Sequence, residues 1–162
     1  MGPVQAQLTD DTRAAFRMCA DCLASILRAE AGGTAGKAEL TARRLVLHSV
    51  QAFENYLGET PPQNYGGLLR YGKRDALPAA SLPSTDEIAR YTEEIRAQAL
   101  ECLGGHEDEQ LLIARNEWGK SLFWRAYYCI RHAHQHLGHV DQLLYAKSDP
   151  RGWRCFSYRY DD

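Results

Sequence analysis

Apolar residues recur every three or four positions in four stretches of this 162-residue chain, a spacing that places them on one face of an α-helix. The first stretch covers residues 8–31, with Thr9 as a candidate N-cap and Gly32 and Gly33 at its end. The second stretch covers residues 39–57. Because the connection between them is short, we expect these two stretches to form antiparallel neighbouring helices.

A capping box marks the start of the third predicted helix. Ser84 precedes an apolar stripe and Glu87 follows three residues later, so each side chain can bond the other residue's backbone N–H. Two glycines at 104–105 end this stretch. An acidic linker over residues 106–110, with a short turn or helical start after it, leads to the longest predicted helix, over about residues 119–146.

A Pro- and Gly-rich stretch without helical periodicity, residues 58–83, separates the second and third predicted helices. A loop of this length is usually functional or a crossover that spans the fold. Leu and Ala far outnumber Val and Ile, which also favours helix over strand. We therefore predict one all-α domain over residues 1–162, a four-helix bundle over about 8–146 with a long crossover between helices two and three and a C-terminal tail over 147–162.

Charge and hydropathy restrict the classes of partner. The chain has 19 basic and 21 acidic residues and a formal net charge of -2, which argues against a protein that binds nucleic acid through phosphate contacts. It contains no run of 18 apolar residues and no basic segment followed by an apolar stretch at its N-terminus. We expect a cytoplasmic protein that binds neither membrane nor nucleic acid. Aromatic residues crowd positions 118–128 and 153–160, and we expect their apolar surface to support a homodimer.

The five cysteines do not indicate a disulfide framework, because their number is odd and the chain is long enough to build a core without one. Cys19 and Cys22 form a CxxC pair that could indicate a redox protein. The pair lies within a predicted helix and not at a helix start after a strand, and no second pair completes a zinc site. The redox interpretation is therefore disfavoured.

Four of the six histidines lie between residues 132 and 139. His132 and His136 are four residues apart, so they stand one helical turn above each other at the border of the apolar stripe and can bind one ion, whereas His134 faces away. His48 lies in the middle of the second predicted helix. If the second and fourth helices are neighbours, three imidazoles can converge on one ion. Hydrogen-bonded or solvated histidines remain the alternative, because spacing alone does not place the two helices together.

The segment IRHAHQHLGHV, residues 130–140, resembles the last helix of the DinB-like (YfiT-like) metalloprotein superfamily. The pattern of that superfamily is a His, three residues, a second His, a small residue and then His or Gln. The long crossover, the PSTDE start of the third helix at residues 83–87 and a histidine within the second helix are similar too, so the likeness covers about residues 8–146. The motif His-Arg-Gly-Gln, which is common in that superfamily, is replaced here by His-Leu-Gly-His at residues 136–139. This difference weakens assignment to one subfamily.

The resemblance implies a divalent metal ion, commonly nickel or zinc, held by three histidines. One ligand comes from helix two and matches His48, and two come from helix four and match His132 and His136. His139 matches the position that holds either His or Gln in the superfamily. It is therefore a candidate to line the pocket next to the ion, and it is not a predicted ligand. Three neutral imidazoles leave a coordination position open to substrate, in contrast to a closed four-ligand structural site.

Characterised members of this superfamily act as thiol transferases or isomerases with low-molecular-weight thiols such as bacillithiol or mycothiol. The resemblance therefore implies a metal-dependent transferase that activates a small thiol and adds it to an electrophile. Glu54, Tyr127 and Tyr128 are candidates to orient the substrate, although structural roles are the alternative for each. A stress-associated bundle without catalytic activity, whose ion is structural or incidental, is the second interpretation of the whole chain.

Overall fold

The computed structural model describes residues 1–33, 36–57, 70–72, 77–113, 115 and 119–145. Regular structure in these residues is helical, apart from an isolated bridge between Arg115 and Ser121. The all-α prediction is thus confirmed for the described part of the chain. The helices in chain order are α1 (Pro3–Ala31), α2 (Lys37–Leu57), the 3-10 turn η2 (Ala79–Ser81), α3 (Thr85–Gly104), α4 (Asp108–Ile113) and α5 (Leu122–Tyr145).

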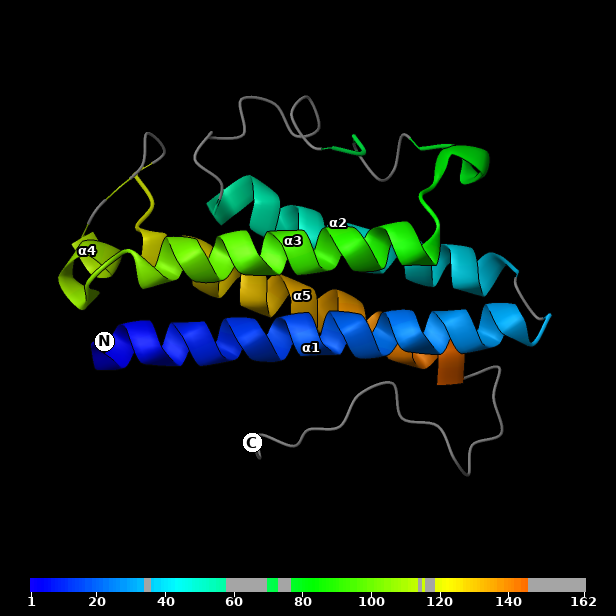
Figure 1. The fold of residues 1–162 in the computed structure, drawn as a ribbon, viewed down its shortest axis with the longest axis horizontal. Helices are drawn as coiled ribbons and strands as arrows, with labels where there is room; N and C mark the ends of the chain where they lie inside the picture. The colour runs from blue at the N-terminus through cyan, green and yellow to red at the C-terminus, as the bar shows by residue number, and fades with distance from the viewer. Residues whose placement is uncertain (34–35, 58–69, 73–76, 114, 116–118, 146–162) are drawn as a thin grey trace.

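The four long helices lie side by side, with α1 and α5 running in one direction and α2 and α3 in the other (Figure 1). Helix α2 packs most extensively against α5, and α1 contacts α2, α3 and α5. The predicted antiparallel packing of the first two helices is present. Helices α2 and α3 run in the same direction (Figure 1). The predicted crossover over residues 58–83 lies largely outside the described residues.

The core lies between the four long helices and receives side chains from each of them. The rings of Phe16 on α1 and Phe53 on α2 are 4.6 Å apart between centroids. Burial of the apolar stripe, more than helix propensity, stabilises such helices. Further fully buried core residues are Ile26, Val46, Leu47, Val50, Ile88, Tyr91, Leu103, Leu111 and Leu137.

The start of α3 has the predicted capping box. The Ser84 hydroxyl accepts from the backbone N–H of Glu87 at 3.3 Å, and the Glu87 carboxylate accepts from the backbone N–H of Ser84 at 2.7 Å. These two bonds satisfy two donors that a helix start otherwise leaves open. The same helix ends at Gly104 with Gly105 as its C-cap, as predicted.

Helix α1 begins earlier than predicted, and its N-cap is Gly2 instead of Thr9. Thr9 is buried within the helix. The open backbone donors at the start of α1 are satisfied by α4, since the carboxylate of Asp108 accepts from the N–H of Val4 at 3.1 Å and of Gln5 at 2.9 Å. Because this partner is 103 to 104 positions away in the sequence, no local pattern predicts it.

Two further boundaries differ from the prediction. Helix α5 begins at Leu122, after Ser121, whose hydroxyl accepts from the backbone N–H of Trp124 at 3.1 Å; Gly119 has a φ of +69°, a left-handed conformation that excludes it from the helix. Over the described residues α5 has 24 residues and α1 has 29, so α1 is the longer of the two within this part of the chain. The predicted end at Ala146 and the tail over 147–162 lie outside the described residues. No described helix is long and apolar enough to cross a membrane.

Candidate metal centre

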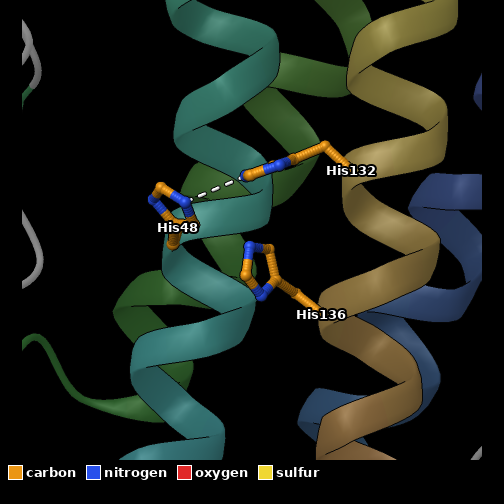
Figure 2. Close-up of side chains that lie close together, drawn as sticks. All are labelled: His48, His132 and His136. Atoms are coloured by element: carbon orange, nitrogen blue, oxygen red, sulfur yellow. Dashed lines mark hydrogen bonds between the residues drawn. The ribbon is translucent and has the colours of Figure 1, made fainter.

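The packing of α2 against α5 brings His48, His132 and His136 together. Figure 2 shows the three imidazoles pointing toward one another, His48 from α2 and the other two from successive turns of α5. The ring centroid of His48 lies 4.8 Å from that of His132 and 4.9 Å from that of His136. The two α5 rings are 4.4 Å apart and nearly perpendicular, at 82°. The structure thus forms the three-histidine cluster that the sequence indicated.

The apolar stripes of the two helices determine this placement. Leu47 on α2 and Ala133 and Leu137 on α5 are fully buried, and each is the immediate neighbour of a cluster histidine. Successive helical residues point about 100° apart, so the histidines fall at the edge of the core, where they are half-buried. A half-buried imidazole can contact its partners and remain accessible to an ion from solvent.

Two polar contacts connect the same pair of helices on the side of the cluster toward the start of α5. The Cys129 thiol donates to the carbonyl of Ala52 at 3.4 Å, and the Arg125 guanidinium donates to the carbonyl of Tyr56 at 2.8 Å. Partial burial of Arg125 lowers its pKa. Because these contacts join residues one and two turns along from His48, they set the register at which His48 meets α5.

The distances within the cluster suit a divalent ion. The Nε2 atoms of His48 and His132 are 2.9 Å apart. Two nitrogens that bind one ion at about 2.05 Å are about 2.9 Å apart when the angle between the two bonds is 90°. At the tetrahedral angle they are about 3.3 Å apart. All three ligand nitrogens lie within 4.8 Å of one another, so small ring rotations have to shorten the widest separation. Imidazole is a common ligand of zinc, nickel, copper and iron, and the donor set therefore fits a transition metal.

The two other histidines of the 132–139 window and two of the candidates to orient substrate lie outside the cluster. His134 and His139 on α5 are exposed and do not belong to the cluster. Glu54 on α2 accepts a hydrogen bond from the hydroxyl of Tyr91 on α3, so its carboxylate takes part in packing between helices. Tyr127 is 55% exposed, and its ring stacks on that of Phe123.

From the sequence, Tyr128 is a candidate to orient substrate. Its contact with the histidine cluster was not predicted. The ring of Tyr128 stacks on that of His132, with centroids 5.4 Å apart and planes at 19°. Trp124 stacks in turn on Tyr128, with centroids again 5.4 Å apart and planes at 13°. The signal in the sequence is the spacing of four residues that joins Trp124, Tyr128, His132 and His136 into one row on α5.

The four cysteines among the described residues form no disulfide with one another. Cys19, Cys22 and Cys129 are buried, and Cys102 is partly buried. Burial raises the pKa of the Cys19 thiol to about 12 and also raises the pKa of Cys129. Because the thiolate is the nucleophile, neither residue is suited to nucleophilic chemistry near neutral pH.

Comparison of the chain with protein-family models, with curated proteins and with solved structures found no match in any of the three.

Proposed function

We propose that the chain is a DinB-like metalloprotein. Its four long helices form a four-helix bundle, the segment between α2 and α3 is the crossover, and His48, His132 and His136 bind one divalent ion, with nickel and zinc as the first candidates. The observation that carries the proposal is the convergence of three imidazoles from two antiparallel helices. The parallel directions of α2 and α3 support the crossover.

For the reaction, we propose transfer of a low-molecular-weight thiol to an electrophile. When bound, the ion lowers the pKa of a thiol that reaches its open position, which favours the thiolate. The thiol loses its proton to solvent water, the sulfur lone pair forms a bond to the electrophilic carbon, and the bond from that carbon to a leaving group breaks, so that the leaving group departs with the bonding electrons. The histidines fix the place of the thiol, and the rings of Tyr56 and Tyr128 pack on each other on the side toward the start of α5.

The test is thiol consumption by protein that was purified without a His-tag and loaded with Ni²⁺ or Zn²⁺. A small thiol and 1-chloro-2,4-dinitrobenzene serve as probes, and formation of the thioether is followed by absorbance. We expect the loaded wild type and a loaded His134→Ala control to exceed both the metal-free protein and the His132→Ala variant treated in the same way. Equal rates for the loaded and metal-free wild type would contradict the transferase proposal.

One observation favours the non-catalytic alternative. The Nε2 atoms of His48 and His132 are 2.9 Å apart, so a hydrogen bond in which one imidazole donates and the other accepts can join α2 and α5 without an ion. In that case the cluster serves packing of the fold, and a bound ion only reinforces it. Metal would then raise the unfolding temperature by mass action while thiol consumption stays at the background rate.

We also propose a homodimer. Exposed apolar side chains gather on α4 and at the start of α5, where Ile113 is 62% exposed, Tyr127 55% and Trp124 39%. Large apolar side chains exposed together often mark a surface that associates with another protein. Sedimentation at micromolar concentration is expected to show twice the chain mass of 18.3 kDa, and a monomer alone would contradict the proposal.

A further inference from the structure

We infer that Tyr128 is a positioning residue for His132, holding the imidazole in the orientation that presents Nε2 to His48. The inference rests on the metal-binding function proposed above and adds a residue that is not itself a ligand. The torsion about the Cβ–Cγ bond of a histidine is broad, so an external contact has to fix the ring plane. The near-parallel stack of Tyr128 on His132, at 5.4 Å and 19°, provides such a contact.

Tyr128 is well suited to this role because its own ring is held on several sides. Trp124 stacks on it from the preceding turn of α5, with planes at 13°. Tyr56 packs on it from α2, with centroids 4.7 Å apart and planes at 46°. The ammonium of Lys120 lies 4.8 Å from the centroid of Trp124 and so extends the row by another turn.

The row therefore connects the packing of α2 and α5 to the orientation of a metal ligand. His132 also contacts the ring of His136 edge-on at 4.4 Å, so its plane influences the relative placement of all three nitrogens. Contacts that orient metal ligands commonly change metal affinity by about 10- to 100-fold when they are removed. In this cluster the stack adds to the orientation that hydrogen bonds supply in other metal sites.

Tyr127 offers a matched control for a substitution at Tyr128. It is the same residue type on the same helix, but its ring stacks on Phe123 and faces solvent. The three variants are Tyr128→Leu, Tyr128→Phe and Tyr127→Leu. Their readouts are Zn²⁺ affinity by competition with a chelator and the visible absorption spectrum of the Co²⁺-loaded protein, which reports ligand geometry.

We expect Tyr128→Leu to weaken Zn²⁺ binding by about tenfold or more and to alter the Co²⁺ spectrum. Tyr128→Phe keeps the aromatic face and should retain both the wild-type affinity and the wild-type spectrum. Tyr127→Leu should match the wild type as well. Equal affinity and identical spectra for Tyr128→Leu and Tyr127→Leu would overturn the inference.

Imidazole NMR of the metal-free protein separates this inference from the proposed function. In the wild type, the carbon-bound protons of His132 should be shifted upfield by the stacked ring and should give one narrow set of signals. Tyr128→Leu should lose both features and Tyr128→Phe should keep them. If the wild type binds no Zn²⁺, the proposed function fails, whereas these spectra still decide whether Tyr128 orients His132.

A second variant covers the case in which Tyr128→Leu does not fold. Trp124→Leu removes only the outer ring of the row, at a side chain that is 39% exposed. With less support for Tyr128, the signals of His132 should broaden in this variant. His132 signals that are identical in Trp124→Leu and the wild type would overturn the inference.

Discussion

Replacement of Asp108 by Ala is expected to destabilise the protein through the start of α1, far away in the sequence. The Asp108 carboxylate accepts from the backbone N–H groups of Val4 and Gln5 at 3.1 and 2.9 Å. Loss of an N-cap typically costs about 0.5–2 kcal/mol, and loss of a negative charge near the positive end of the helix dipole adds about 0.3–1 kcal/mol. We expect the free energy of unfolding to fall by about 1–3 kcal/mol, or roughly 2–12 °C in Tm for a chain of this size.

A double-mutant cycle tests this reasoning with Gly2. A Cβ added at Gly2 would lie 2.3 Å from Cγ of Asp108, so Gly2→Ala has to displace the carboxylate from its bonds to α1. The loss of stability from Gly2→Ala should therefore be large in the wild type and much smaller once Asp108 is Ala. The two costs should not add.

Urea unfolding followed by circular dichroism measures all four members of the cycle. Glu109→Ala is the control, because it removes an exposed carboxylate from the same first turn of α4. We expect this control to change stability by less than about 0.5 kcal/mol. Equal stability of Asp108→Ala and Glu109→Ala, or additive costs for Gly2→Ala and Asp108→Ala, would refute the role of Asp108 as the cap of α1.

Three other predictions concern stability. A Cβ at Gly138, inside α5, would meet no described atom within 4 Å, so Gly138→Ala should raise the free energy of unfolding in urea by about 0.5–1 kcal/mol, and no rise would contradict the reasoning. The hydroxyl of Thr12 is buried and has no hydrogen-bond partner among the described residues, so Thr12→Val should leave stability unchanged or raise it by up to about 1 kcal/mol; a clear loss in urea unfolding would show a partner. The pKa of Cys19 rises from 9.0 to about 12 on burial, so the unfolded chain loses this proton first and stability should fall as pH rises from about 9 toward 12. Thermal unfolding of Cys19→Ala against the wild type should show a shallower decline over that range, and parallel curves would contradict the assignment.

The contrast between α3 and α1 shows which helix boundaries a sequence can predict. Ser84 and Glu87 cap α3 from three residues apart, so the signal is contained in a short window. The cap of α1 comes from Asp108 on another helix, and no local pattern reveals it. The start of α5 is displaced by the conformation of Gly119, which periodicity alone does not report.

The sequence likewise predicts one part of the candidate metal centre and leaves another part to tertiary packing. The spacing of His132 and His136 placed both on one face of α5, and the exposed position of His134 agrees with that assignment. Whether His48 reaches them depends on the packing of α2 on α5, which is a tertiary contact that sequence spacing does not contain. The spacing of four residues places Tyr128 next to His132 on the surface of α5. Aromatic residues near a helix start are more often part of a core, however, so the spacing alone does not predict the stack.

The direct test of the account is the amount of metal bound per chain in four single variants. The protein is purified without a His-tag, incubated with Zn²⁺ near neutral pH and freed of excess metal before elemental analysis. His48→Ala, His132→Ala and His136→Ala should each lose most of the ion, whereas His134→Ala should retain it, because only the first three imidazoles share a site. Wild-type occupancy should fall below about pH 6, since imidazole binds metal only in its neutral form. Full occupancy in all four variants would contradict the three-histidine site, and loss in His134→Ala with retention in His132→Ala would reverse the assignment of the helix face.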